Sequence, residues 1–533
     1  MSPVHLGLPA RPGPHAPDGV GHLRGTEGFP AAAHHELRDR QLRGNLRNAT
    51  RTIRAKRGEV VAEKPDWQRL RDAGSAIKRD VNARLPELLE QFEAAVTARG
   101  GRVHWARDAV EAGRIVTDLV RATGETEVVK VKSMATEEIG LNDRLAEAGV
   151  HAQETDLAEL IVQLADDTPS HILVPAIHRN RSEIREIFLE GIPGVREDLG
   201  EDPAELAEAS RTFLRERFMA AKVAISGANF GIAETGTVAV VESEGNGRMC
   251  LTLPETLITV MGIEKLLPAY RDLEVFLQLL PRSSTGERMN PYTSLWTGVT
   301  PGDGPAEFHV VLLDNGRTAA LGDAIGAEAL KCIRCSACLN ICPVYERAGG
   351  HAYGSTYPGP IGAILTPQLT GMADHGDPNA SLPYASSLCG ACFEVCPVKI
   401  DIPAALLELR QRKVAETRPP VERRIFAALG TVMGHRALWD ATVRMASLAR
   451  LLGGRSGRIP PLPSFLAGWT DARDTPVPPK AAFRQWWGGD EAAALLAGER
   501  EHPVPSRIRG GAAARGDDAA GEGEGGDGKE ARR

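Results

Sequence analysis

Seven of the eight cysteines in this 533-residue chain fall into two short motifs between residues 332 and 396. The first motif reads C-x2-C-x2-C-x3-C-P and contains Cys332, Cys335, Cys338 and Cys342. The second reads C-x2-C-x3-C-P and contains Cys389, Cys392 and Cys396. This spacing is typical of chains that hold two iron–sulfur clusters through cysteine thiolates. The motifs therefore predict a pair of four-iron clusters that transfer electrons one at a time.

The two motifs also predict which cysteine binds which cluster. In two-cluster ferredoxins the last cysteine of each motif binds the cluster of the other motif. This rule gives Cys332, Cys335, Cys338 and Cys396 to cluster one. It gives Cys342, Cys389 and Cys392 to cluster two, which is then one cysteine short. Ser386 occupies the position where a full second motif would begin. Ser386, an exogenous ligand or a partner's side chain would complete cluster two, or a three-iron cluster would form there.

Zinc is the main alternative metal, because one C-x2-C pair from each motif would satisfy a zinc ribbon. That interpretation leaves Cys338, Cys342 and Cys396 without a role, together with both Cys-Pro pairs. Iron–sulfur chemistry accounts for all seven motif cysteines and is the stronger prediction. The eighth cysteine, Cys250, lies far from the motifs in sequence, and we interpret it as a small buried apolar residue.

Composition excludes some classes of protein. The net charge of −7 and the pI of about 6.1 give no reason to expect nucleic-acid binding. No apolar run approaches the roughly 18 residues of a membrane span, and the N-terminus has no signal-peptide core. We therefore expect a cytoplasmic protein without a transmembrane segment, which its partners could hold at the membrane surface. Cysteines in that compartment stay reduced and more often bind metal than form disulfides.

The elements around the motifs alternate between helix and strand from about residue 70 to 315. Apolar runs predict short strands at 103–105, 127–132, 171–175, 237–242, 258–261 and 308–313. Apolar residues at helical spacing predict helices at 85–96, 109–122 and 141–148. This alternation predicts an α/β domain with a largely parallel sheet, followed by a mainly helical part that carries the cysteines.

The domain boundaries follow from changes in composition and periodicity. The predicted parts are a disordered N-terminus (1–30), a helical arm that packs on the body (31–69), the α/β domain (70–315), the dicluster domain (320–415), a helical and Pro-rich region (416–505) and a disordered tail (506–533).

The α/β part offers a few candidate substrate-binding residues. Glu234 and Thr237 lie in a glycine-rich loop before a strand, where they could hold a carboxylate or form an ordinary structural turn. Lys132 ends a predicted strand beside a possible helix start, where it could bind an anion or remain an exposed edge lysine. The pair Glu264-Lys265 is most simply a surface ion pair or the start of a helix. Catalytic residues are not assigned.

Several segments together resemble the lactate utilization protein B family. They are Ser226–Thr237, Thr252–Thr256, Met261–Lys265, the first cysteine motif, His351–Ser355, Gly359–Gly362 and Tyr384–Cys392. The resemblance covers residues 35–490 in order, and the family shares the four-plus-three cysteine pattern. It implies a lactate-utilization-type parallel-sheet domain, similar in fold to the isomerase and CoA-transferase group, and two four-iron clusters.

The resemblance also implies a function and partners. The family's activity is NAD-independent oxidation of L-lactate to pyruvate. The partners it implies are the A and C proteins of the system, and the electrons pass on to a respiratory acceptor. The chain has no G-x-G-x-x-G after a strand, so we expect an electron relay for a redox partner. Alternatively, cluster two binds substrate as a Lewis acid. Two other functions stay open: a relay for another 2-hydroxy acid such as glycolate, and a carboxylate-binding regulatory module with structural clusters.

Overall fold

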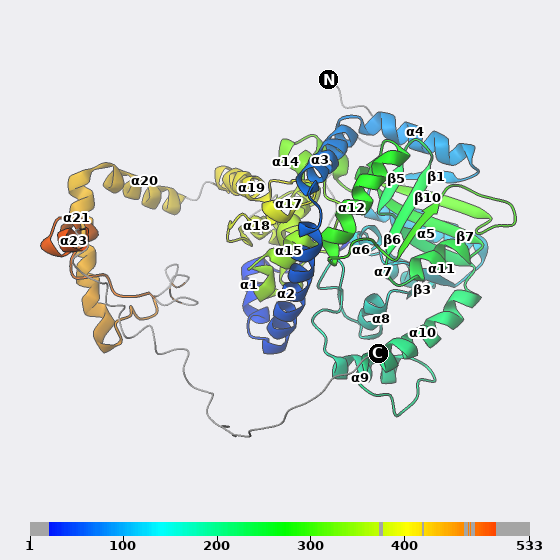
Figure 1. The fold of residues 1–533 in the computed structure, drawn as a ribbon, viewed down its shortest axis with the longest axis horizontal. Coiled ribbons are helices and arrows are strands. Elements are labelled where there is room, and N and C mark those ends of the chain that lie inside the picture. The colour runs from blue at the N-terminus through cyan, green and yellow to red at the C-terminus, as the bar shows by residue number, and fades with distance from the viewer. Residues whose placement is uncertain are drawn as a thin grey trace, which may run out of the picture. The chain divides into compact units, whose positions relative to one another are not determined.

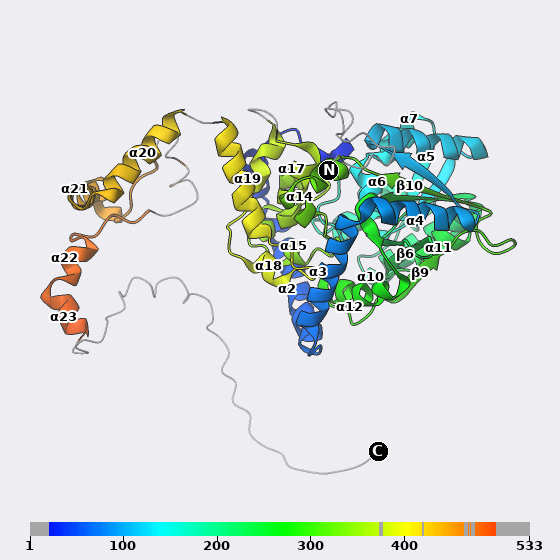
Figure 2. The ribbon, with the colours of Figure 1, turned by 90° about the horizontal axis from the view of Figure 1, so that it is seen from above.

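The computed structural model describes residues 21–372, 377–417, 420–462, 467, 470 and 475–496. The chain divides into two compact units, Met1–Thr417 and Arg418–Arg533. The first unit contains the α/β stretch (Figures 1 and 2). It also contains all seven motif cysteines. Residues 1–20 and the predicted disordered tail at 506–533 lie outside the described residues.

A six-stranded parallel sheet forms the centre of the α/β part (Figure 1). Its strands are β1 (Arg102–Ala106), β2 (Glu127–Lys130), β3 (His151–Glu154), β4 (Val223–Gly227), β7 (Thr256–Gly262) and β10 (Glu307–Leu313). The spatial order is β1-β10-β7-β4-β2-β3, and every neighbouring pair is parallel. The prediction of an α/β domain built on a parallel sheet is therefore confirmed.

Helices cover both faces of this sheet because alternate strand residues point to opposite sides. Phe308, Val310 and Leu312 of β10 join one apolar core, whereas Val311 and Leu313 join the other. The first core is covered by α4 (Leu85–Ala98), α10 (Pro203–Ala220) and α11 (Asn246–Thr252), and the second by α5 (Ala109–Thr123) and α7 (Leu141–Glu147). A smaller core lies between α10, α8 (Leu157–Leu164) and α9 (Arg181–Gly191).

A second, four-stranded sheet lies in the same α/β part, and the sequence did not predict it. Its strands are β5 (Phe230–Ile232), β6 (Thr237–Glu242), β8 (Leu266–Leu267) and β9 (Tyr292–Trp296). The order is β8-β5-β6-β9, with antiparallel pairing of β5 with β6 and of β6 with β9. The predicted strand at 237–242 thus exists but belongs to this mixed sheet.

The predicted strand at 171–175 is wrong, because this segment forms bends and turns. The His171 ring occupies backbone donors that a strand would use. Its Nδ1 accepts hydrogen bonds from the backbone N–H groups of Leu173 and Val174, at 3.0 and 3.1 Å. Its Nε2–H donates to Asn340 Oδ1 at 3.1 Å. A local side-chain partner thus replaces the strand ladder.

The N-terminal helices pack on the rest of the first unit. They are α1 (Phe29–Glu36), α2 (Arg40–Ala62) and α3 (Trp67–Ala83). Leu42 and Leu46 of α2 are buried in the core that also holds the cysteines. Residues 21–30 were expected to be disordered, but they are ordered in part. Leu23 is 1% exposed, and the Phe29 ring lies 4.9 Å from that of Tyr353, so apolar anchors hold this stretch.

The cysteine-bearing part consists of short helices joined by loops. They are α13 (Arg317–Leu321), α14 (Ala324–Ala329), α15 (Ala337–Ile341), α16 (Tyr345–Ala348), α17 (Gly359–Thr370), α18 (Ala391–Val395) and α19 (Ile402–Thr417). The remaining described α-helices of the first unit are α6 (Met134–Glu138) and α12 (Leu273–Ser284). Short 3-10 helices lie at Gly21–Leu23, Ile263–Lys265, Tyr270–Asp272, His351–Tyr353 and Pro378–Tyr384. Helices α15 and α18 contact each other, which brings the two cysteine motifs together.

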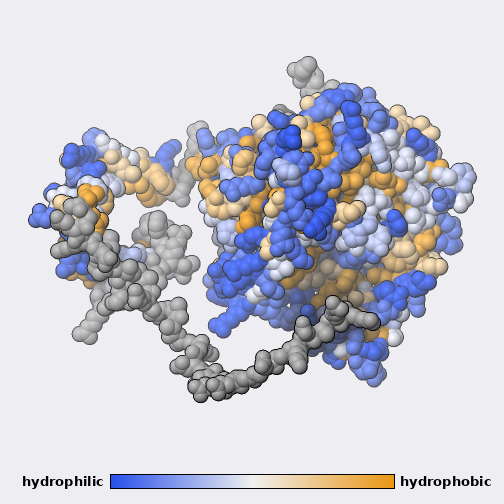
Figure 3. Space-filling model, in the orientation of Figure 1, coloured by the Kyte–Doolittle hydropathy of each residue, from blue (hydrophilic) through white to orange (hydrophobic). Residues whose placement is uncertain are grey.

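The second unit contains α20 (Pro420–Gly434), α21 (Arg436–Ala446), α22 (Phe483–Trp487) and α23 (Asp490–Leu496). Several apolar side chains on α20 and α21 are exposed, including Phe426, Met433 and Met445, and Figure 3 shows apolar residues gathered over α20. Within the described residues, no helix combines the length and apolarity needed to cross a membrane.

Candidate metal centres and an adjacent pocket

Cys332, Cys335, Cys338 and Cys396 line one small cavity in the first unit. The first two lie in the loop before α15, the third lies on α15, and the fourth follows α18 directly. Arg334 has a left-handed backbone φ of 61°, which bends the loop between the first two cysteines. Residues from both motifs therefore meet around a common space.

The surroundings of these four thiols suit an iron–sulfur cluster. The backbone N–H of Arg334 donates to Cys332 Sγ at 3.4 Å, and that of Ile400 donates to Cys396 Sγ at 3.3 Å. Burial raises the pKa of Cys335 far above its ordinary value and that of Cys396 to about 11. Thiolates at this depth need a positively charged metal group. Backbone donors to sulfur are among the features that tune such clusters.

The other three motif cysteines form a second group. Burial, followed by the neighbouring thiols of Cys342 and Cys389, raises the pKa of Cys392 to about 12. Cys389 is exposed, whereas the other two are buried. Ser386 lies in the loop before Cys389, and its hydroxyl accepts a hydrogen bond from the backbone N–H of Leu388 at 3.1 Å. This group has three sulfurs and an exposed side.

The sulfurs of the motif cysteines are farther apart than ligands of a single zinc ion. Thiolates sharing one zinc ion, with Zn–S bonds of about 2.3 Å, lie about 3.8 Å apart. In the described part of the chain, no three cysteine sulfurs lie within 4.8 Å of one another. The only such set of possible metal ligands there is Asp167, His178 and His351. Asp167 is already paired with His178 at 2.8 Å and with Arg179.

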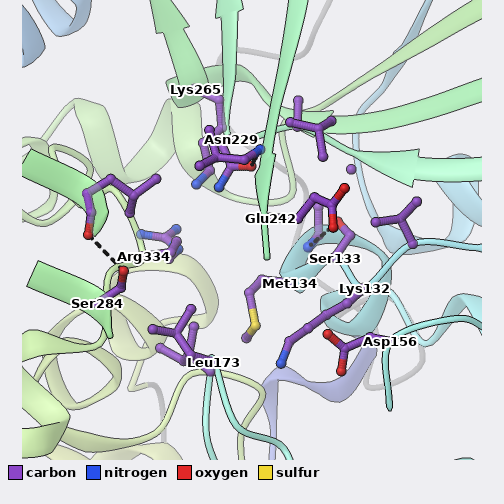
Figure 4. Close-up of a pocket in the computed structure, with 18 of the residues that line it drawn as sticks. Lys132, Ser133, Met134, Asp156, Leu173, Asn229, Glu242, Lys265, Ser284 and Arg334 are labelled. Carbon is purple, nitrogen blue, oxygen red and sulfur yellow. Dashed lines mark hydrogen bonds between the residues drawn. The ribbon is translucent and has the colours of Figure 1, made fainter. Parts of the chain in front are cut away.

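A pocket of about 210 Å³ lies at the carboxyl edge of the main sheet (Figure 4). Lys132, Asp156, Asn229 and Lys265 follow four of the parallel strands and line it. Ligand sites of parallel α/β sheets commonly form at this edge. Arg334 lines both this pocket and the cavity of the first cysteine group. The two sites are therefore neighbours that share a side chain.

One wall of the pocket is cationic. Arg317 donates to Glu138 Oε2 at 2.8 Å through Nη2 and to Glu264 Oε2 at 2.5 Å through Nε. Arg334 Nη2 donates to Glu264 Oε1 at 3.1 Å. Burial, and next the positive charge of Arg334, lower the pKa of Lys265 to about 8. Within the described part of the chain, Lys265 forms no hydrogen bond or ion pair through its ammonium group.

Carboxylates predominate on the opposite wall, which contains Asp156, Glu242 and Glu244 together with Lys132. Glu242 accepts hydrogen bonds from the backbone N–H groups of Glu244, at 3.1 Å, and Gly245, at 2.6 Å. Burial and the nearby Asp156 raise the pKa of Glu244 to about 7. Figure 4 draws Glu242 and Asp156 on the side away from Arg334.

The candidate substrate residues do not all lie together. Lys132 lines the pocket, with its Nζ 3.3 Å from Glu159 Oε1. Glu234 and Thr237 are outside the pocket lining. The Glu234 carboxylate accepts a hydrogen bond from the backbone N–H of Tyr270 at 2.8 Å, and the Thr237 hydroxyl bonds two other threonine hydroxyls.

Glu264 and Lys265 do lie in a short 3-10 helix, Ile263–Lys265, but the alternative expectation of a surface ion pair is wrong. Glu264 is 1% exposed and pairs with two arginines, while Lys265 lines the pocket. One sequence signal could have found Lys265, since it follows the carboxyl end of a buried parallel strand.

Two family models match the chain. Residues 89–313 match the LUD domain, and residues 328–400 match the 4Fe-4S dicluster domain. The fold and the cysteine groups thus define an iron–sulfur protein with an α/β LUD domain. A solved structure of a DUF162 family protein from Deinococcus radiodurans is 15% identical, covers 43% of this chain and 98% of its own, and has a TM-score of 0.24.

Curated relatives are similar along most of the chain. Lactate utilization protein B of Bacillus licheniformis is 42% identical over 87% of this chain and 97% of its own length. The protein of the same name from Bacillus subtilis is 40% identical over 88% and 98%. An uncharacterized electron transport protein of Escherichia coli, YkgF, is 39% identical over 87% and 97%. The chain belongs to the lactate utilization protein B family.

Proposed function

We propose that this chain is the iron–sulfur electron-transfer subunit of a system that oxidises L-lactate to pyruvate without NAD. The observation that carries the proposal is the gathering of four cysteines around one cavity and three in a second group. Membership of the lactate utilization protein B family supports lactate as the source of the electrons.

The proposal assigns each cysteine to a cluster. Cluster one takes Cys332, Cys335, Cys338 and Cys396. Cluster two takes Cys342, Cys389 and Cys392, with one iron left for a ligand other than cysteine. The backbone donors at Cys332 and Cys396 stabilise negative charge on sulfur, and so favour the reduced form of cluster one.

The oxidation of L-lactate to pyruvate releases two electrons and two protons. A four-iron cluster carries one electron at a time, so the two electrons pass singly through this chain. We place the two-electron step with a redox partner, the A or C protein, because this reaction needs a two-electron carrier such as flavin and the sequence has no G-x-G-x-x-G motif after a strand. The chain's contribution is to hold the relay and to pass the electrons toward a respiratory acceptor.

Anaerobic reconstitution with iron and sulfide tests the ligand assignment. We expect about eight irons per wild-type chain and about four in Cys392→Ser, with dithionite-bleachable absorbance in both. Cys250→Ser is the matched control, because Cys250 is fully buried in the α/β core and should leave the iron content unchanged. Zinc without inorganic sulfide would overturn the redox role, and eight irons in Cys392→Ser would overturn the assignment.

Reduction by substrate tests the pathway. The chain mixed with the A and C proteins should bleach on addition of L-lactate and should not respond to L-lactate without them. Faster bleaching with glycolate than with L-lactate would indicate that glycolate, not L-lactate, is the source of the electrons.

A further inference from the structure

Among the residues that the structure describes, the pocket at the edge of the main sheet contains an ammonium group without an ion pair and a guanidinium N–H without a hydrogen bond, although the same guanidinium pairs with Glu264 through Nη2. Lys265 forms no ion pair among the described residues, and Arg334 Nε is buried there without a hydrogen-bond partner. Arg334 is only 6% exposed, so its guanidinium cannot turn to bulk water. Asn229 lies beside Lys265 in Figure 4 and adds an amide to this wall. A buried cationic wall around an open cavity is suited to an anion.

We propose that this pocket binds a small monocarboxylate, with the carboxylate held between Lys265 and Arg334. The volume of about 210 Å³ is below the roughly 300–1,000 Å³ of sites for drug-sized ligands. Met134, Leu173 and Leu280 line the same space and offer contacts to a short alkyl group. The identity of the ligand as a 2-hydroxy or 2-oxo acid rests on the proposed function. The existence of a carboxylate-binding site rests only on the residues that line the pocket.

The acidic wall makes the pocket selective for a single negative charge. Figure 4 draws Glu242 and Asp156 across the cavity from Arg334, with Lys132 beside Asp156. Glu244 lines the same pocket within electrostatic reach of both carboxylates and of Lys132, so three carboxylates outnumber one ammonium on this side. A second carboxylate on the ligand would meet these groups, and like charges brought together at close range are costly. We therefore expect pyruvate and L-lactate to bind and the dicarboxylates malate and oxaloacetate to be rejected.

Arg334 links the pocket to the first cysteine group. Its guanidinium lines the pocket, while its backbone N–H donates to Cys332 Sγ at 3.4 Å. A bound carboxylate neutralises positive charge next to this group, which favours the less negative, oxidised form of cluster one. Ligand binding should therefore lower the midpoint potential of cluster one, while cluster two responds less.

The competing explanation is that these cations only balance the thiolates of cluster one. Lys265 and Arg334 both lie within electrostatic reach of Cys332. If that explanation holds, replacing Lys265 changes the midpoint potential of cluster one. The wild-type chain, which keeps Lys265, then binds no carboxylate ligand. A direct binding measurement separates the two explanations.

The test is anaerobic titration calorimetry of the full-length, cluster-loaded chain with pyruvate and with L-lactate. Lys265→Gln should weaken binding by at least about tenfold, equivalent to 1.4 kcal/mol. Lys222→Gln is the matched control, since Lys222 is exposed on the same domain and pairs with Glu125 at 3.7 Å. Iron and sulfide counts on each variant report whether the clusters and the fold are intact.

Selectivity and potential supply two further readouts. Glu244→Gln should improve malate binding relative to pyruvate, and saturating pyruvate should lower the potential of cluster one in the wild type but not in Lys265→Gln. A loaded wild-type chain that binds neither acid overturns the carboxylate site and leaves the electron-transfer proposal standing. Equal affinity for pyruvate and malate overturns the selectivity. Binding of pyruvate and L-lactate to a chain that holds no inorganic sulfide would support the carboxylate site and would overturn the electron-transfer proposal.

Discussion

At the residue scale, Arg317 shows how a buried charge network supports the pocket. It is 2% exposed and holds two buried carboxylates, Glu138 and Glu264. Burial would raise the pKa of Glu264, but Arg317 and Arg334 outweigh burial and hold it at about 2. Removing one partner of a buried ion pair leaves a charge without compensation.

Arg317→Met should therefore destabilise the chain by about 3–5 kcal/mol near neutral pH. Without Arg317 the carboxylates take up protons more readily, so the deficit should shrink as the pH falls. Denaturant unfolding at neutral and mildly acidic pH measures both effects. Arg211→Met is the control, because Arg211 pairs with Glu208 on an exposed face of α10 and its loss should change little. A deficit as small as that of the control would contradict the role of the network.

Ser386 is the residue to change at the incomplete cysteine group. Ser386→Cys restores the full second motif and offers a fourth thiolate in the loop before Cys389. We expect the variant to keep its iron longer in air and to show less of the three-iron signal in electron paramagnetic resonance. Ser387→Cys, one residue along the same loop, is the control and should not protect the cluster. Equal loss of iron in both variants would show that position 386 does not face cluster two.

The sequence predicts the cysteine groups well because ligand spacing in a short loop is a local property. It predicts the pocket poorly because its residues come from separate strands and from the cysteine loop. Lys132 was a candidate from the sequence and lines the pocket, and its role there stays a prediction. Lys265 was interpreted as part of a surface pair or a helix start, since burial of Glu264 depends on Arg317 from a distant segment. Gly236, in the glycine-rich loop before β6, adopts a left-handed φ of 68°.

At the element scale, His171 connects the segment before α9 to α15 of the cysteine-bearing part. Burial lowers the pKa of His171 to about 4 from its ordinary 6.5. Between these two pH values the unfolded chain binds a proton that the folded chain does not. The free energy of unfolding should therefore decrease as the pH is lowered from about 6.5 to about 4, by up to about 1.4 kcal/mol per pH unit from this group.

His171→Gln should be less stable than wild type near neutral pH, because Gln cannot reproduce both sets of hydrogen bonds. Its stability should fall less steeply as the pH drops through this window, since the titrating group is gone. Denaturant midpoints across the window measure the slope. The exposed His151, changed to Gln, is the control and should keep the wild-type slope. A slope in His171→Gln equal to that of wild type would contradict the buried neutral ring.

The elements of the main sheet were predictable because buried parallel strands are short apolar runs. The segment at 171–175 has the same composition but no ladder, since the His171 ring binds its backbone donors. The second sheet was missed because β5 and β8 are only three and two residues long. Their strand conformation depends on pairing with strands that are distant in the sequence, and a short stretch of sequence does not contain those partners.

At the scale of the whole molecule, the LUD part and the cysteine-bearing part share one hydrophobic core. Phe230 and Phe276 of the α/β part belong to the same buried cluster as Cys335, Leu339 and Val398. Both parts fall within the single compact unit that ends at Thr417. The boundary between the two family matches therefore runs through one continuous hydrophobic core, and the two matched segments are not independent domains.

Truncation tests this division of the chain. A chain that ends at Thr417 keeps the shared core and all seven motif cysteines, so it should retain both clusters and a melting temperature close to that of the full chain. A chain that ends at Leu321 loses one side of the core and exposes Phe230, Phe276 and Leu280, so it should aggregate or melt far lower. Thermal melting and iron counts on the two truncations measure the contrast. Cooperative, wild-type-like melting of the shorter chain would show that the LUD part folds alone, and the shared core would then not be essential to it.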